Sequence, residues 1–263
     1  MSDPSTGSGI DSTGSGIDST GSGIDSTGSG TDARTVPSAA KFIAIDGPAG
    51  SGKSSVSKAI ARQRGYGLLD TGAAYRALAW LMLENQADTD DAEAVIAAAS
   101  DFDLRLGLDP DDRTVAVGDT DITAAIREPR VSSAVSGVAR VPAVREQVNI
   151  FFRSLVANSP LPAVVVEGRD ITTVVAPDAP VRILLTAAPE VRAARRAGEL
   201  AGENAAAVAE ALHKRDASDS AVVDFLNAAE GVEVVDSTAL DFSQTIDAVL
   251  SVIDRKQGAE HGR

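Results

Sequence analysis

The sequence predicts an α/β fold, in which a parallel sheet is flanked by helices and carries a small antiparallel β insertion and a helical lid. Apolar, β-branched runs alternate with longer helix-forming stretches, the order typical of βαβ units. A glycine-rich turn joins the first apolar run, 42–46, to the first helical stretch, 54–64. Residues 101–121 interrupt the alternation with short strand-like segments. With 263 residues, 43% of them hydrophobic, the chain is long enough for one such domain with a small insertion.

Four apolar runs are expected to form the parallel sheet, with helices between them. The expected strands are 42–46, 163–167, 181–186 and 232–236, and the expected helices are 54–64, 142–158, 189–199 and 241–255. In the insertion, residues 103–108 and 114–118 alternate around the turn residues 109–112, which predicts a hairpin in a substrate-covering lobe. The predicted domain therefore covers 40–257, with an insertion lobe at about 88–130, an Arg- and Ala-rich lid at about 189–222 and a C-terminal tail at 258–263.

A low-complexity tail is predicted for residues 1–39. Residues 5–32 contain Ser-Thr-Gly-Ser-Gly-Ile-Asp three times in succession and then once more with Thr in place of Ile. One apolar residue and two glycines in each heptad exclude a coiled coil. Because such a segment cannot bury enough apolar surface to offset its ordering entropy, we expect a disordered tail with no part in the chemistry; partner binding is the alternative.

The composition limits the partners that the chain can have. The net charge is −14; residues 1–39 hold five Asp and one Arg, or −4, which leaves −10 for the remainder. An acidic domain argues against general binding to nucleic acid or anionic membrane. Cysteine is absent and there are two histidines, so neither disulfides nor a thiolate or histidine metal site are expected. No apolar run reaches the ~18 residues of a membrane span and no secretory signal is visible, so a cytoplasmic protein is expected. We also expect it to be a monomer.

The most informative motif is the glycine-rich turn. It reads Gly47-Pro48-Ala49-Gly50-Ser51-Gly52-Lys53-Ser54 and is followed by Ser55, which matches the P-loop pattern G-x-x-x-x-G-K-[ST]. Glycines allow successive backbone N–H groups to converge on an anion, and the helix that follows adds its positive N-terminal end. Lys53 can then reach the β- and γ-phosphates of ATP, and Ser54 can offer its hydroxyl to Mg²⁺. The sequence therefore predicts a P-loop protein that binds ATP and magnesium through residues 47–55.

A P-loop alone does not select a substrate, because GTPases, motor ATPases and small-molecule kinases all carry it. The guanine-reading segment Asn-Lys-x-Asp is absent, which disfavours a GTPase. Four further segments follow the loop: 68–76, 121–127, 142–146 and 164–171. In their order and spacing they resemble those of bacterial cytidylate kinases, a family of nucleoside-monophosphate kinases. The resemblance covers nearly all of residues 41–256, and its D-[ST]-G-x-x-Y-R and G-R-D segments are more specific than the P-loop.

The resemblance implies transfer of the γ-phosphoryl group of ATP to CMP or dCMP, as part of pyrimidine nucleotide metabolism. At family positions, Arg76 and Arg169 would hold the acceptor phosphate. Asp170 would accept a hydrogen bond from the cytosine amino group, and Arg145 would donate to the ring carbonyl and N3. Ser136 would lie beside the base.

The remaining residues that the family pattern implies flank the acceptor and the lid. Asp70, Thr71 and Tyr75 would position the acceptor nucleotide, and Arg215 and Asp219 would contact ribose and phosphates from the far edge of the lid. The catalytic set implied by the resemblance is Lys53, Arg76, Arg169 and Arg215. These groups suit phosphoryl transfer, which depends on alignment and charge neutralisation rather than on covalent chemistry by the protein.

Two positions depart from the family pattern. Thr172 stands where the family commonly has glycine, which is unfavourable if the backbone there needs a positive φ. Val222 lies in a run, 221–226, that lacks the arginine usual in the family, so Arg192 or Arg195 would have to compensate for a missing cation. Two alternatives follow from these observations: a P-loop kinase for another small acceptor, and an NTP-binding module with an impaired lid.

Overall fold

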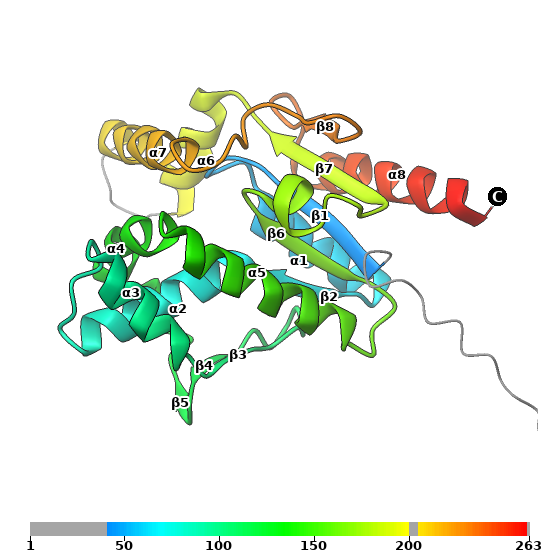
Figure 1. Cartoon of the computed structure of the whole chain (residues 1–263). Helices are drawn as coiled ribbons and strands as arrows, with labels where there is room; N and C mark the ends of the chain where they lie inside the picture. Colours follow the sequence, from blue (N-terminus) through cyan, green and yellow to red (C-terminus); the bar gives the residue numbers. More distant parts are fainter. Residues whose placement is uncertain (1–40, 200–204, 262–263) are drawn as a thin grey trace, which may run out of the picture. The chain divides into compact units, whose positions relative to one another are not determined.

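A computed structural model describes residues 41–199 and 205–261 of the chain. Its central sheet has five parallel strands in the order β2-β6-β1-β7-β8 (Figure 1). Their bounds are β1 Phe42–Asp46, β2 Gly67–Asp70, β6 Val164–Gly168, β7 Val181–Thr186 and β8 Glu233–Asp236. The predicted α/β class with a parallel sheet is therefore confirmed, and all four expected strands are present. The strand β2 was not predicted. The repeat tail predicted at 1–39 lies outside the described residues.

Both faces of the sheet are buried, and the central strand shows how the sequence achieves this. All five residues of β1 are buried. Phe42 and Ala44 belong to one apolar core, and Ile43 and Ile45 belong to a second core on the opposite face. Since successive side chains of a strand point to opposite faces, a continuous apolar run is what a parallel strand covered on both sides requires.

Helices cover both faces of the sheet. On one face α1 and α8 supply apolar side chains such as Ile60 and Ile253, and on the other α2 to α5 pack together (Figure 1). The helices are α1 Lys53–Arg64, α2 Thr71–Glu84, α3 Ala92–Ser100, α4 Pro129–Ala139, α5 Pro142–Ala157, α6 Pro189–Glu199, α7 Ala205–Ser220 and α8 Phe242–His261. The last helix extends beyond the predicted end at residue 255, because its final turns consist largely of good helix formers. Among the described helices, none is both long and apolar enough to cross a membrane.

The predicted antiparallel insertion is also confirmed. A separate sheet contains β3 Leu104–Leu106, β4 Val115–Val117 and β5 Thr120–Asp121 in that order, with β3 and β4 paired antiparallel. The strands are shorter than the predicted segments, because the connection between them is a loop closed by a hydrogen bond from the Gly107 N–H to the Thr114 carbonyl (2.8 Å). A short 3-10 helix, η2 Ala125–Arg127, follows this sheet.

Candidate active site

The P-loop joins β1 to α1 at the carboxyl end of the sheet, the edge where ligands of open α/β sheets bind. Gly47 has φ 153°, and a Cβ there would lie 2.1 Å from the backbone oxygen of Leu185 on β7. Gly52, with φ 91°, is the N-cap of α1. Because these positions exclude a side chain or favour a left-handed backbone, the glycines of the motif are required for the curl of the loop. The first N–H groups of α1 are thereby left at the mouth of the loop.

Lys53 is buried at the start of α1. Its Nζ donates a hydrogen bond to the Pro48 carbonyl at 3.1 Å, which folds the side chain across the loop. The pKa of Lys53 is lowered to about 7, mainly by burial and also by the neighbouring Arg169 charge, while the Glu167 charge opposes the shift. Because the protein itself stabilises the positive charge of Lys53 so weakly, a bound anion near its ammonium group would be favourable.

Glu167, at the end of β6, is the main functional candidate that the sequence interpretation missed. It accepts a hydrogen bond from Ser54 Oγ at 2.7 Å, and its second oxygen, Oε1, is buried without a partner. The pKa of Glu167 is raised to about 7, mainly by burial and also by the Asp70 charge, while the Lys53 charge opposes the shift. The signal in the sequence was the apolar run 163–166, which is followed directly by an acidic residue. The strand that this run forms pairs with β1, the strand that leads into the P-loop.

A second group of residues lies at the end of β2 and in the first turns of α2. Arg76 Nη2 donates to Asp70 Oδ2 at 2.7 Å, while Arg76 Nε is buried without a partner. Burial raises the pKa of Asp70, but the charges of Arg76 and then Arg113 and Arg127 outweigh it, so that the net shift is downward. Thr71 Oγ1 donates to the Glu167 carbonyl at 2.8 Å, which ties α2 to β6.

Arg145 and Asp170, the two residues predicted to contact the base, form an ion pair with each other. Arg145 on α5 donates to Asp170 and, through Nη1, to the Ala139 carbonyl at 3.3 Å. Burial raises the pKa of Asp170, and the Arg145 charge opposes this shift. The Tyr75 hydroxyl is buried without a partner, and burial raises its pKa. This hydroxyl is therefore available to a ligand.

The segment predicted as a lid forms α6 and α7, and Arg169 is one of the arginines that connect it to the P-loop. Arg169 donates to the Gly47 carbonyl at 2.8 Å and to Asp219 Oδ2 on α7 at 3.1 Å, and its guanidinium lies 5.1 Å from the Phe225 ring centre. Arg215 is 3.9 Å from the same Asp219 oxygen. Burial lowers the pKa of Arg215, and the Arg169 charge adds to this effect.

These groups surround one cleft of about 770 Å³. The predicted site residues that line it are Ala49, Gly50, Gly52, Lys53, Ser54, Ser55, Asp70, Thr71, Tyr75, Arg76, Ser136, Arg145, Arg169, Asp170, Arg215 and Asp219. The predicted residues Gly47, Pro48 and Ser51 do not line it, although Gly47 and Pro48 accept hydrogen bonds from Arg169 and Lys53. Ser136 accepts a hydrogen bond from Ser218 of α7 at 3.2 Å, so the lid reaches across to α4.

The two lid arginines expected to compensate for the missing cation instead support the P-loop backbone. Arg192 donates to the Ala49 carbonyl at 2.9 Å and pairs with Asp216, whose Oδ1 accepts from the Ala49 N–H at 3.2 Å. Arg195 donates to the Ser51 carbonyl at 3.3 Å and to Ser237. In this arrangement neither lines the cleft.

Thr172 causes no backbone strain. Its N–H and its Oγ1 both donate to Asp46 Oδ2 at 2.7 Å, and the Ile171 N–H donates to the other oxygen at 3.0 Å. Within the described ranges, Gln86 is the only residue other than glycine with a positive φ. Burial raises the pKa of Asp46, and its hydrogen bonds to Thr172 and Ile171 oppose this. The threonine thus fixes the π-helical turn η3, Ile171–Val175, to β1.

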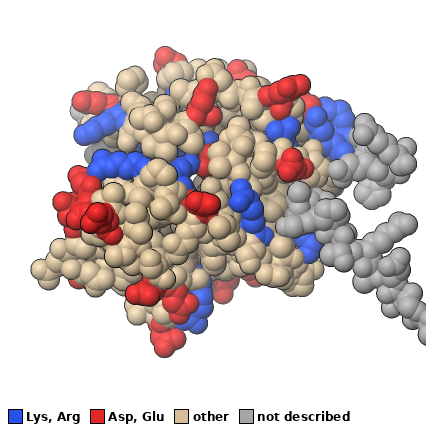
Figure 2. All heavy atoms as spheres, in the orientation of Figure 1, with Lys and Arg blue, Asp and Glu red and all other residues tan. Residues whose placement is uncertain are grey.

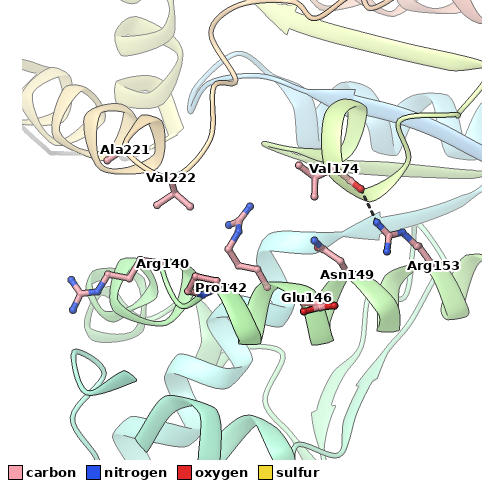
Figure 3. Close-up of a pocket in the computed structure, with 9 residues that line it drawn as sticks. Arg140, Pro142, Glu146, Asn149, Arg153, Val174, Ala221 and Val222 are labelled. Atoms are coloured by element: carbon pink, nitrogen blue, oxygen red, sulfur yellow. Dashed lines mark hydrogen bonds between the residues drawn. The ribbon is translucent and has the colours of Figure 1, made fainter. Parts of the chain in front are cut away.

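A second pocket of about 650 Å³ adjoins the cleft and shares four lining residues with it, Arg140, Arg145, Ala221 and Val222. Figure 3 shows its residues on α5, on η3 and at the end of the lid, including Arg153, whose guanidinium donates to the Val174 carbonyl at 2.7 Å. Val222, the position without the usual arginine, borders both spaces. Over the face drawn in Figure 2, acidic and basic side chains are interspersed among the described residues.

The fold and the site define a class: a P-loop protein whose cleft is lined by the loop and by a second set of arginine and carboxylate side chains. The cytidylate kinase model matches residues 43–255. Curated cytidylate kinases are similar over most of their length: the one from Streptomyces avermitilis is 47% identical over 230 residues, covering 87% of this chain and 98% of the relative. The one from Streptomyces coelicolor is also 47% identical over 230 residues, with the same coverage, and the one from Mycobacterium avium is 42% identical over 225 residues, covering 83% of this chain and 97% of the relative. The chain belongs to the cytidylate kinase family.

Proposed function

We propose that the cleft of about 770 Å³ transfers the γ-phosphoryl group of ATP to CMP or dCMP, with the P-loop holding the donor and the groups around Arg76, Arg145 and Asp170 holding the acceptor. Membership of the family gives the reaction: the chain is an ATP-using phosphotransferase that phosphorylates CMP and dCMP. The observation that supports the residue assignment is that one cleft brings together the P-loop and the acceptor groups.

In the proposed step, an oxygen of the acceptor phosphate bonds to the γ-phosphorus while the bond from that phosphorus to the β,γ-bridging oxygen breaks. The products are the nucleoside diphosphate and ADP. Lys53 neutralises the donor phosphates, Arg76 and Arg169 hold the acceptor phosphate, and Arg215 on the lid adds positive charge as the phosphoryl group moves. Asp219 holds Arg169 and Arg215 on the side of the lid.

We also assign a magnesium ion to the donor half. Mg²⁺ binds oxygen ligands, commonly through one or two carboxylates together with substrate phosphates. Ser54 Oγ and Glu167 are 2.7 Å apart and Glu167 Oε1 is buried without a partner, so these residues suit such an ion. When bound, the ion would neutralise charge on the β- and γ-phosphates. Ser54 would contact it, and Glu167 would hold it directly or through its waters.

Replacing Glu167 by glutamine tests the magnesium assignment. The change keeps the shape and the hydrogen bond from Ser54 but removes the negative charge, so the Mg²⁺ concentration needed for half-maximal activity should rise by about tenfold to a hundredfold. Activity should be titrated with Mg²⁺ at saturating ATP. Asp254→Asn, on the surface of α8, is the matched control and should leave the titration unchanged. An unchanged titration for Glu167→Gln would remove Glu167 from the magnesium site.

Acceptor specificity tests the base-reading pair. ADP release should depend on CMP or dCMP, and AMP, GMP and UMP should be far weaker acceptors. Asp170→Asn should lower kcat/KM for CMP by about a hundredfold with a much smaller change in KM for ATP, because a carboxylate that accepts from the cytosine amino group is replaced by an amide. A coupled ADP-release assay across the monophosphates measures both. Equal rates with all acceptors would contradict the specificity, and equal losses at both nucleotide sites would contradict the role of Asp170.

We further propose that the protein acts as a monomer in the cytoplasm. Every group assigned above to the donor and acceptor halves belongs to this one chain, so the proposed site is complete without a partner. Sedimentation of the purified protein at assay concentration tests the oligomeric state, and fractionation of cells tests the location.

A further inference from the structure

Two arginines of the insertion lobe line the cleft, and the residue roles proposed above leave them unassigned. These are Arg113, on the loop between β3 and β4, and Arg127, at the end of η2. Within residues 41–199 and 205–261, neither side chain has an ion pair or a hydrogen bond. An arginine beside a cleft without a protein partner is suited to an anionic ligand.

The loop that carries Arg113 is fixed against the sheet by long-range contacts. The Leu68 N–H on β2 donates to the Leu108 carbonyl at 2.8 Å, and Arg62 on α1 pairs with Asp111. A Cβ on Gly107 would lie 2.8 Å from the Asp112 carbonyl oxygen, so the two sides of the loop approach closely. The loop therefore runs along the edge strand β2. Arg113 is half-buried and lies near the carboxyl end of the loop.

Arg113 lies on the side of the cleft where we place the acceptor nucleotide. With Asp70 and Ala73 it also lines a small recess beneath α2, so it lies beside the Asp70–Arg76 pair. Asp70 is already occupied by Arg76 at 2.7 Å. Arg76, Arg113 and Arg127 all act on Asp70 and line the same cleft. Even with Glu167 nearby, these arginines outnumber the carboxylates at this end of the cleft, and a phosphate would balance the excess positive charge.

The electrostatics of Asp70 agree with this placement. Burial raises the pKa of Asp70, and the charges of Arg76, Arg113 and Arg127 lower it. The Arg113 charge therefore acts on the same carboxylate that pairs with Arg76.

We propose that Arg113 is an additional acceptor-binding residue, whose guanidinium pairs with the phosphate of CMP or dCMP beside Arg76. This inference rests on the proposed function of the cleft. It also accounts for the loss of a lid cation at Val222: Arg192 and Arg195 are engaged by the P-loop backbone, and the positive charge comes from the insertion lobe instead.

Calorimetric binding of CMP and of cytidine, which lacks the phosphate, tests the proposal. Arg113→Gln should raise the Kd for CMP by about tenfold, the usual size of a hydrogen bond to a charged group, and should leave cytidine and ATP binding unchanged. Arg105→Gln is the matched control. Arg105 lies on β3 of the same sheet and makes an exposed 3.3 Å ion pair with Asp119, away from the cleft. The control should leave all three affinities unchanged.

Three results would overturn the proposal: a CMP Kd that stays within twofold of the wild type, an equal loss for cytidine, or a loss confined to ATP. If Arg113→Gln lowers the Tm substantially, Arg113→Lys takes its place, since it keeps the charge and loses the planar fork; it should still weaken CMP binding severalfold and spare cytidine. A wild-type protein that binds ATP but no CMP would contradict the proposed function itself, which separates the two failures.

Discussion

Replacing Lys53 by alanine should reduce kcat by about a thousandfold or more, the range seen when a preorganised electrostatic donor to the reacting group is removed. Lys53 is buried within the P-loop and lines the cleft, and it is the cation that we propose neutralises the donor phosphates. The loss should appear in kcat and in kcat/KM together, because the interaction strengthens as charge moves between the phosphates. Single-turnover measurement of ADP formation with CMP checks it.

The fold should survive this change. Burial lowers the pKa of Lys53 to about 7, so the folded protein binds this proton less readily than the unfolded chain does. The charge therefore opposes folding at low pH, and this penalty disappears as the pH rises from about 7 toward the ordinary lysine value. The Tm of Lys53→Ala should accordingly not fall below that of the wild type at pH 6. Lys58→Ala, one turn further along α1 and outside the cleft, is the control, and unchanged turnover of Lys53→Ala would refute the assignment of the cleft.

Replacing Arg76 by lysine should lower kcat/KM for CMP by about a hundredfold and leave the KM for ATP nearly unchanged. Arg76 uses Nη2 to pair with Asp70, and its Nε is buried without a partner. A planar guanidinium can bind a carboxylate and a phosphate at once, whereas an ammonium ion satisfies Asp70 but cannot reproduce the fork. Steady-state kinetics with each substrate varied in turn measures the two effects.

Arg130→Lys is the control for charge-conserving arginine replacement. Arg130 forms exposed ion pairs with Glu84 and Glu128, so the change should alter neither kinetic constant. A loss for Arg76→Lys that falls equally on ATP and CMP would place Arg76 at the donor phosphates rather than at the acceptor.

The sequence predicted best the parts of the molecule whose signals are local. The apolar runs that form β1 and β7 have the predicted bounds, since each is a short β-branched run between turn residues. Strand β2 was missed because its four residues begin with glycine and lead directly into α2, leaving no turn to mark it. The hairpin was found from its turn residues, but not the contacts that fold its loop against β2.

The site shows the same division. The P-loop is contiguous, so it could be recognised from its own residues. The ion pair between Arg145 and Asp170 was not predicted, because the family pattern assigned each of them separately to the base. Glu167 and Arg113 acquire their importance only from neighbours distant in the chain: Ser54 is 113 residues from Glu167, and the loop around Arg113 is held by Leu68 and Arg62. Sequence also could not reveal that Arg192 would face a backbone carbonyl rather than a phosphate, because that depends on how α6 meets the loop.

The hydrogen bonds from α6 and α7 to Ala49 have a consequence for nucleotide binding. Asp216 accepts a hydrogen bond from the Ala49 N–H while Arg192 donates to the Ala49 carbonyl, so α6 and α7 hold the peptide groups on both sides of this P-loop residue. Coupling free energies are reciprocal: if bound nucleotide favours this conformation of the loop, it also favours the packing of α6 and α7 against the loop, and that packing strengthens nucleotide binding by the same factor. Breaking the Arg192–Asp216 pair should therefore weaken nucleotide binding even though neither side chain lines the cleft.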